Sequence, residues 1–371
     1  MYMENSEKRF VHLHTHSHYS LLDGMSKVPD LVKTAKEFGM TALAITDHGV
    51  MYGAIEFYKE CKKAGIKPII GVEAYVATRS RHDKEPDHDG RRYHLTLLAK
   101  NNVGYKNLMY MTSVASTEGF YYKPRMDKEL FQKHGEGIIC LSGCPGSEFI
   151  TLLKNNHIDE AKELLNFYIN CFGKENVFIE VMKHDEIDWY KPLIPIIISI
   201  SNEMNLPIVG TWDSHYLHTD DVEAHDTLVA INTGADVNSK KMSMKDGNYS
   251  FIDSDKANEV FKDIPGAVAN TSMVADLIDL EIELDKLYFP DYKIEDGKTA
   301  DELLRELAEN GFALRNMEKT EEALTRLNYE LDIIKMKGYP SYFLVVADLL
   351  RFARENGILS NIRGSVAGSL T

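Results

Sequence analysis

The sequence has few cysteines and no long apolar run. Four cysteines in 371 residues are too few for a disulfide framework, so reduced thiols are expected. The most apolar stretch, residues 193–200, is short and contains Pro195, so it cannot span a bilayer. The first nine residues are polar and show no signal-peptide pattern. These absences predict a cytoplasmic protein without a membrane partner.

The sequence also has fewer basic than acidic residues. Lys and Arg number 42 against 57 Asp and Glu, which gives a net charge of −15. A protein that coats nucleic acid uses clustered Lys and Arg, so this balance argues against that class. Nucleic acid stays open as a substrate, because bound cations can supply local positive charge. The 14 histidines are the unusual part of the composition.

Apolar runs alternate with amphipathic stretches through the first two thirds of the chain. Seven runs rich in Ile, Val and Leu are predicted to be buried strands: residues 10–13, 42–45, 68–76, 94–98, 137–141, 177–181 and 207–210. The helices expected between them include residues 29–38, 54–64 and 105–116. This alternation predicts an α/β fold with a parallel sheet closed like a barrel, and an open doubly wound sheet is the alternative.

The pattern changes after about residue 227. A polar stretch at 232–248 is expected to be an irregular connection, and an extended linker is expected at 287–291. Helices are predicted at residues 255–261, 265–278, 300–314 and 321–336. We therefore expect two domains, residues 8–275 and residues 276–371.

Histidines and carboxylates follow the predicted strands. His14 and His16 alternate along the first strand, so their side chains point the same way and can hold one cation. Further ligand-type residues lie in or after the later strands: Asp47, His48, Glu73, His94, Cys144, Asp213 and His215. Since strand ends of a parallel sheet or barrel meet at one rim, these side chains are expected to converge.

Imidazole, carboxylate and thiolate together suit Zn, Mn or Fe better than Ca or Mg. So many ligands exceed the needs of one ion, which predicts a multinuclear cluster suited to phosphate ester hydrolysis. Asp47 is expected to orient a ligand. His12 and His18 lie on the opposite face or beyond the strand, so they are left open between a ligand role and a structural or supporting one. Taken alone, Cys144 would be a buried core thiol.

Several motifs resemble the polymerase and histidinol phosphatase (PHP) domain that opens the C-family bacterial replicative polymerases. They are His14-x-His16, Ser20-Leu-Leu-Asp-Gly24, Ala44-Ile-Thr-Asp-His-Gly49, Gly71-Val-Glu-Ala-Tyr75 and Thr211-Trp-Asp-Ser-His-Tyr216. The resemblance implies a distorted (β/α)7 barrel that binds two or three divalent ions and hydrolyses phosphoesters. The implied ligands are His14, His16, Asp23, His48, Glu73, His94, Cys144, Asp213 and His215, and the implied catalytic residues are Asp47, His14 and Asp213.

The resemblance continues to the end of the chain. Residues 329–334 and 338–348 resemble the entry to the family's palm domain, which predicts a partial and mostly helical segment. The final motif, Arg363-Gly-Ser-Val-Ala-Gly-Ser369, resembles the palm element that cradles a nucleoside triphosphate. Its implied nucleotide-binding residues are Arg363, Gly364, Ser365, Gly368 and Ser369. Residues 360–362 depart from the family pattern, which has Gly-Pro-Gly there, and no polymerase acid cluster is expected before Thr371.

The resemblance implies a part in DNA replication, as the N-terminal portion of a DNA-directed DNA polymerase with a 3′–5′ exonuclease of its own. The implied partners are a DNA primer-template or single-stranded 3′ end and, for the complete protein, a dNTP with Mg, the sliding clamp and other replisome subunits. A stand-alone phosphatase acting on a small phosphate ester is one alternative. A structural module stabilised by metal is the other.

Overall fold

The computed structural model describes residues 9–183, 187–234, 244, 247–284, 286, 288–289, 292–294, 297–361, 364 and 368–371. The chain forms two compact units, one up to Ile282 and one from Glu283 to Thr371. The domain boundary predicted at 275/276 stays a prediction. Most of the expected linker at 287–291 and most of the expected irregular stretch at 232–248 lie outside the described residues.

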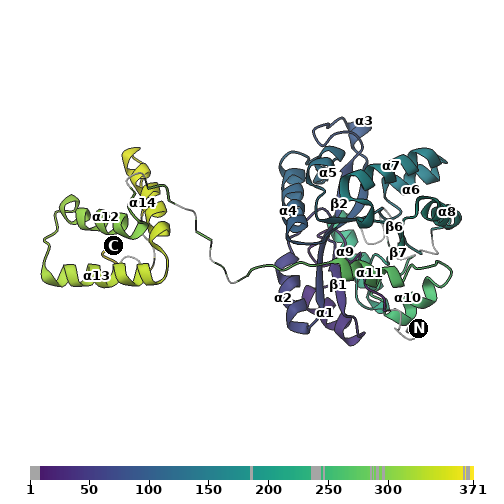
Figure 1. The fold of residues 1–371 in the computed structure, drawn as a ribbon, viewed down its shortest axis with the longest axis horizontal. Helices are drawn as coiled ribbons and strands as arrows, with labels where there is room; N and C mark the ends of the chain where they lie inside the picture. Colours follow the sequence, from purple (N-terminus) through teal and green to yellow (C-terminus); the bar gives the residue numbers. More distant parts are fainter. Residues whose placement is uncertain are drawn as a thin grey trace. The chain divides into compact units, whose positions relative to one another are not determined.

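A seven-stranded mixed sheet forms the centre of the first unit, with helices around it (Figure 1). Its strands are β1 (Ala42–Ile45), β2 (Lys67–Ala77), β3 (Arg92–Ala99), β4 (Arg125–Met126), β5 (Ile138–Leu141), β6 (Val177–Val181) and β7 (Ile208–Gly210). The order is β1-β2-β3-β5-β6-β7, and the short β4 pairs with β2. The predicted α/β fold with a barrel-like sheet is confirmed, and β4 was not predicted.

The prediction of an all-parallel sheet is wrong at β3. This strand runs antiparallel to both of its neighbours, β2 and β5. The connection from β2 to β3 contains only α3 (Pro86–Asp89), a helix of four residues. A parallel return would have to cross back over β2, which at 11 residues is about 36 Å long. A connection without a long helix therefore favours the antiparallel pairing.

The segment 12–16 closes the sheet toward a barrel without forming a regular strand. On one side the Ala44 amide donates to the carbonyl of His12 at 2.9 Å, and the Thr46 amide donates to the carbonyl of Thr15 at 2.9 Å. On the other side Thr15 forms a parallel bridge with Ser214, beyond the end of β7. The strand predicted at residues 10–13 is thus replaced by an extended segment that lies between β1 and the residues after β7.

The helices that surround this sheet bury apolar faces on it. They are α1 (Val28–Glu37), α2 (Ala54–Ala64), α4 (Asn102–Thr117), α5 (Lys128–His134), α6 (Glu148–Lys154), α7 (Ile158–Phe172), α8 (Ile194–Met204), α9 (Val222–Thr233), α10 (Ser254–Val260) and α11 (Ala269–Leu277). The Asn101 side chain caps α4 by accepting from the amides of Val103 and Gly104. One continuous apolar core runs through the whole unit, from Phe10 to Leu280.

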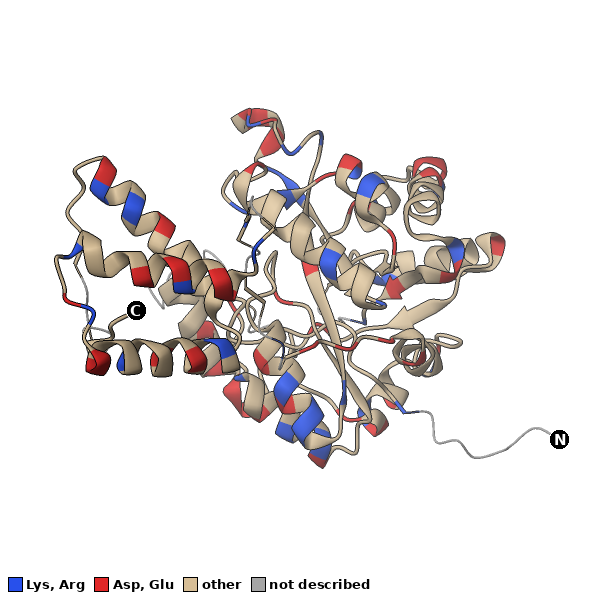
Figure 2. Ribbon diagram, turned by 60° about the vertical axis from the view of Figure 1, so that its left-hand side comes forward, with Lys and Arg blue, Asp and Glu red and all other residues tan. Residues whose placement is uncertain are grey.

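The second unit is helical. It consists of α12 (Ala300–Leu314), α13 (Glu321–Met336) and α14 (Pro340–Glu355). Thr299 and Glu302 form a capping box at the start of α12, which explains why the helix begins where the sequence predicts. Both acidic and basic residues occur along these helices (Figure 2). Among the described helices of both units, none combines the length and the apolar character that a bilayer crossing needs.

Candidate metal centre

Side chains from most strands of the sheet meet at one buried place. His14 and His16 come from the extended segment 12–16, Glu73 from β2 and His94 from β3. The segments that follow other strands and turns supply Asp23, His48, Cys144, Asp213 and His215. The structure thus brings together all nine residues that the sequence predicts as ligands.

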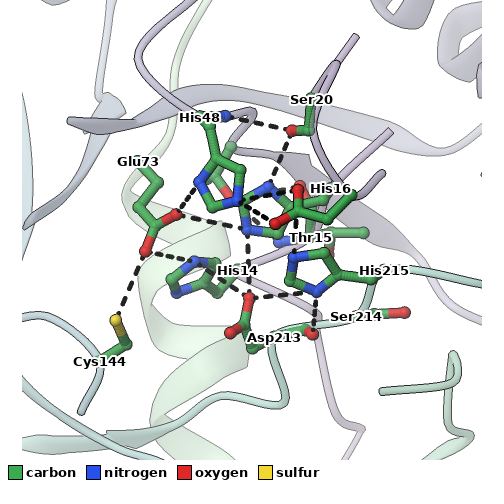
Figure 3. A network of polar contacts seen from close by, with 12 residues as sticks. His14, Thr15, His16, Ser20, His48, Glu73, Cys144, Asp213, Ser214 and His215 are labelled. Atoms are coloured by element: carbon green, nitrogen blue, oxygen red, sulfur yellow. Dashed lines mark hydrogen bonds and ion pairs between the residues drawn. The ribbon is translucent and has the colours of Figure 1, made fainter. Parts of the chain in front are cut away.

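Glu73 lies between His48 and Cys144 in the cluster (Figure 3). Its Oε1 atom is 2.7 Å from His94 Nδ1 and 3.5 Å from His14 Nε2. The Cys144 thiol donates to the same oxygen at 3.4 Å. The second oxygen, Oε2, forms an ion pair with His48 Nδ1. One carboxylate therefore touches donor groups from four other segments, as a bridging ligand would.

Two further carboxylates extend the cluster. Asp213 Oδ1 lies 3.1 Å from His16 Nε2 and 3.5 Å from His14 Nε2. Asp23 Oδ1 lies 3.1 Å from His48 Nε2 and 3.8 Å from His215 Nε2.

Three overlapping groups each place three donor atoms within 4.8 Å of one another. The groups are His16, His48 and His215; His14, His16 and Glu73; and Glu73, His94 and Cys144. The overlap at His16 and Glu73 is the arrangement of a multi-metal site.

Local backbone geometry matters at two of these carboxylates. Asp213 has φ of +52°, in the left-handed region that costs a non-glycine residue about 1–2 kcal/mol. Strain of this kind is held by the surrounding structure and clusters at functional sites. After Asp23, Gly24 packs so closely that a Cβ atom would lie 1.9 Å from the carbonyl oxygen of Ser17, so this turn needs a glycine.

Several atoms of the cluster lack ordinary partners. Six buried atoms of the cluster form no hydrogen bond of good geometry with the described residues: His14 Nε2, His16 Nε2, Asp23 Oδ1, His48 Nδ1, Glu73 Oε2 and Asp213 Oδ1. Buried polar groups without partners are costly, and a native fold holds few of them. Six in one place, with lone pairs facing one another, fit cations that all of them can bind. The donor set therefore fits a metal cluster.

Neighbouring carboxylates and burial together set the pKa values of the histidines. Burial opposes a charge on His14, but Asp213, Glu180 and Glu73 outweigh burial and raise its pKa well above 6.5. Burial lowers the pKa of His16 to about 3. Without cations, the centre would have to hold protons on some histidines to offset its carboxylates. Bound cations remove that need, since they take the place of those protons.

The Cys144 thiol is also governed by its surroundings. Burial and the nearby Glu73 raise its pKa well above 9.0, so it keeps its proton in the absence of a cation. A thiol becomes a strong ligand only as the thiolate, which a metal ion stabilises. Cys144 is thus a ligand that depends on an ion already being present.

Glu180 is a part of the site that sequence reasoning missed. Its Oε1 atom lies 2.8 Å from His14 Nδ1 and accepts a hydrogen bond from Thr211 Oγ1 at 2.6 Å, while Oε2 accepts one from Thr96 at 3.3 Å. A carboxylate on one imidazole nitrogen fixes the tautomer and orients the other nitrogen toward a metal. A signal for Glu180 was present in the sequence, because a lone Glu inside the fully buried strand β6 needs a partner.

Asp47 lies behind the cluster. Its carboxylate accepts hydrogen bonds from the Ser17 amide at 2.7 Å and from Ser20 Oγ at 2.8 Å. Ser20 Oγ is in turn 2.9 Å from His16 Nδ1 (Figure 3). Because the Ser20 hydroxyl donates to Asp47, His16 Nδ1 must donate to Ser20. The lone pair of His16 Nε2 then faces the cluster.

His12 and His18, which the sequence left open, lie apart from the donor groups. His12 Nε2 is 2.9 Å from the carbonyl oxygen of Ile252, and its ring stacks on Phe251 at 4.0 Å. Burial lowers the pKa of His12 to about 4, so it is a neutral core residue at physiological pH. The His18 ring packs on Tyr19 at 4.3 Å. Neither belongs to the three groups of donor atoms.

The candidate phosphate loop is described only in part. Arg363 and Ser365 lie outside the described residues. Gly364 has φ of +77°, and the Ser369 hydroxyl donates to Glu330 Oε2 at 2.7 Å. The nucleotide-binding role of Gly364, Gly368 and Ser369 stays a prediction.

Comparisons with known proteins agree with this arrangement. The PHP domain family matches residues 12–184, and the bacterial DNA polymerase III alpha NTPase domain matches residues 302–371. DNA polymerase III subunit alpha of Borreliella burgdorferi is 41% identical over 367 residues, which cover 98% of this chain. The chain belongs to the bacterial DNA polymerase III alpha family.

The chain corresponds to the N-terminal portion of such a subunit. It spans 32% of the length of the Borreliella burgdorferi protein. The alpha subunit of Treponema pallidum is also 41% identical, over 97% of this chain and 31% of the relative. Among solved structures, an amidohydrolase from Chromobacterium violaceum has a TM-score of 0.36 and 16% identity, covering 55% of this chain and 87% of that one.

Proposed function

We propose that the first unit is a metal-dependent phosphoesterase that removes nucleotides from the 3′ end of a DNA strand. The observation that carries the proposal is the convergence of nine donor side chains, six of whose buried atoms form no hydrogen bond with the described residues. A purely structural zinc site needs four ligands in a closed shell. A larger, overlapping set of donors supports a cluster that leaves positions for a substrate.

The protein's own residues prepare this centre. Glu180 accepts the proton of His14 Nδ1, and Ser20 accepts that of His16 Nδ1, so both Nε2 lone pairs face inward. Thr211 donates to Oε1 of Glu180, the oxygen that also contacts His14, and Thr96 donates to Oε2, which keeps the carboxylate from rotating. We propose that His14 and Asp213 act directly at the reaction centre, and that Asp47 acts by holding Ser20.

Two or three divalent ions would be held by His14, His16, Asp23, His48, Glu73, His94, Cys144, Asp213 and His215. Zn, Mn or Fe best fits a set that mixes imidazole, carboxylate and thiolate. Ions at this place would lower the pKa of a water and offset the negative charge on the phosphate oxygens.

Release of a 3′-terminal label from a single DNA strand tests the proposal. We expect the full 371-residue chain to release the label, to stop when a chelator is added, and to resume when Mn or Zn is restored. Hydrolysis of a small phosphate ester without any attack on the strand would favour a stand-alone phosphatase. A chelator that lowers the melting temperature of a protein inactive on both substrates would favour a structural metal site.

For the longer protein, we propose DNA-directed DNA polymerase activity in the cytoplasm. Its partners would be primer-template DNA, a dNTP with Mg, the sliding clamp and other replisome subunits. Residues 363–369 would contribute to the triphosphate site. We expect no primer extension by residues 1–371, since most of the described acidic residues of the second unit lie on exposed helix faces, as Glu306 does in its ion pair with Lys298, and the buried Glu330 is paired with Arg326.

A further inference from the structure

A groove adjoins the metal centre and shares a wall with it. The groove has a volume of about 280 Å³, and its lining includes His48, Tyr52, Tyr75, Phe120 and Lys123. His48 is one of the nine candidate donors, and the Tyr75 ring lies 5.9 Å from its ring, so the groove begins at the edge of the cluster. A substrate whose reacting group reaches the metal centre can therefore extend into this groove.

Two cations lie on the Tyr75 ring. The Arg92 guanidinium is 5.3 Å from the ring centre, and the Lys123 ammonium is 5.7 Å from it. No carboxylate among the described residues lies within ion-pair distance of either group. In a chain of net charge −15, two such cations beside a cluster of carboxylates are unusual. They fit the phosphate groups of a strand that leads into the centre.

Large aromatic side chains are exposed along the same groove. Tyr52 is 66% exposed and Phe120 is 54% exposed. Exposed rings of this size are costly in water, and stacking on an unpaired base would cover them. Tyr52 and Phe120 thus offer faces for bases, while Lys123 offers a charge for the backbone between them.

The backbone beside the groove is strained at one residue and closely packed at another. Tyr122 has φ of +60°, which is an outlier for a bulky residue, and the Tyr121 amide donates to the carbonyl of Lys123 at 3.1 Å. A Cβ atom on Gly49 would lie 2.9 Å from Tyr75 Cδ2 and 3.0 Å from Pro124 Cγ. Glycine at 49 therefore lets the two loops close on Tyr75. A strained turn that displays aromatic and cationic groups is typical of a binding site.

We propose that this groove is a subsite for unpaired nucleotides, in which Tyr52 and Phe120 stack on bases and Lys123 and Arg92 contact the phosphates. The inference rests on the proposed function, since it places the strand that the metal centre would cut. It also makes that function more specific. A small phosphate ester would reach the metal centre without touching Tyr52 or Phe120, so the groove favours a strand as the substrate.

Binding and hydrolysis measured side by side test the subsite. Binding of a fluorescently labelled single-stranded oligonucleotide to the full chain would be followed by anisotropy, with DNA and RNA strands of equal length. We expect Tyr52→Ala and Phe120→Ala each to weaken binding about 5- to 100-fold, as loss of one stacked base predicts. Tyr52→Phe and Phe120→Tyr keep a ring and should bind like the parent chain. Tyr110→Ala, at a ring that is 51% exposed on α4 and lies outside the groove lining, is the matched control.

Hydrolysis of bis(p-nitrophenyl) phosphate separates the subsite from the proposed function. We expect the groove variants to hydrolyse this small ester as fast as the parent chain. The subsite would be overturned if Tyr52→Ala and Phe120→Ala bound each strand, DNA and RNA, as tightly as the Tyr110→Ala control does. This holds even if the ester is hydrolysed. A parent chain that cleaves neither ester nor strand would overturn the proposed function, while the binding comparison would still decide the subsite.

Discussion

The two units of the chain are stabilised in opposite ways. The first unit has a large apolar core and, within the same unit, a buried cluster of histidines and carboxylates. The second unit has a small core in which the described buried apolar residues are Leu304, Phe312, Leu327, Leu331, Ile334 and Leu344. Most of its described ion pairs lie at the surface, as between Lys335 and Asp301, where each contributes little. The first unit should therefore depend on cations for its stability, and the second should not.

Removal of metal should give the largest difference between the two units. Ions that bind only the folded state stabilise it by about 4 kcal/mol when present at 1,000 times their dissociation constant. We expect elemental analysis to find two or three transition ions per chain, and a chelator to lower the melting temperature of the first unit alone. Calorimetry with and without chelator checks this. A protein free of metal after expression in supplemented medium would contradict the prediction, as would equal shifts in both units.

Replacement of a ligand should have the next largest effect. His14→Ala or Asp213→Ala should reduce phosphodiester hydrolysis by roughly a hundredfold or more, above the 10–100-fold given for residues that only support a ligand. His18→Ala is the control, because His18 packs on Tyr19 outside the groups of donor atoms. Rates on a labelled strand would be measured for all three variants. Similar losses of hydrolysis rate for His18→Ala and His14→Ala would show that the assignment of His14 as a ligand and of His18 as a non-ligand is wrong.

Glu180 allows a finer test of the same unit. Glu180→Gln keeps the shape of the side chain but removes the charge that holds His14 Nδ1–H, so metal affinity should fall about 10–100-fold. Metal titration into the stripped protein measures this without relying on activity. Glu203→Gln, at a carboxylate paired with Lys162 on the surface, should leave the affinity unchanged. If both variants bind metal like the parent chain, Glu180 has only a packing role.

The sequence predicted the first unit well where local pattern controls the structure. Residues 42–45 and 177–181 are strands with the predicted bounds, because continuous apolar runs need burial on both faces. Eight of the nine predicted ligands could be proposed from the sequence pattern, because a histidine, acid or thiol in or after a buried strand has few structural uses, whereas Asp23 came from the family resemblance alone. Glu180 was missed because its partner, His14, is 166 residues away along the chain.

Other features depend on contacts that no local pattern contains. The direction of β3 is set by the connection before it, and the segment 12–16 is shaped by hydrogen bonds such as that from the Thr15 amide to Thr46 Oγ1. The groove is similar, since Tyr52 and Phe120 lie 68 residues apart and their exposure follows from the packing of two loops. Tertiary structure decides these points, and the single sequence does not.

Glu330 gives the smallest expected effect, and it concerns the second unit. Its Oε2 atom accepts hydrogen bonds from Ser369 Oγ at 2.7 Å and from the amides of Leu370 and Thr371 at 2.8 and 3.0 Å, while Arg326 donates to Oε1 at 2.7 Å. Burial alone would raise the pKa of Glu330, but these hydrogen bonds outweigh it and lower the pKa from 4.5 to about 2.

Since the pKa of Glu330 is lower in the folded state than in the unfolded chain, its stabilising effect is present above about pH 4.5 and is lost as the pH falls toward 2. We expect Glu330→Gln to lower the stability of the second unit by roughly 1 to 3 kcal/mol at neutral pH, and the difference from the parent chain to shrink below pH 4.5. Amide hydrogen exchange of residues 368–371 across this range measures the loss. Glu309→Gln, at an exposed carboxylate 3.8 Å from Arg305, should show no such dependence on pH. A difference between Glu330→Gln and the parent chain that stays constant from pH 7 to pH 2 would mean that the charge of Glu330 does not hold the final residues in place.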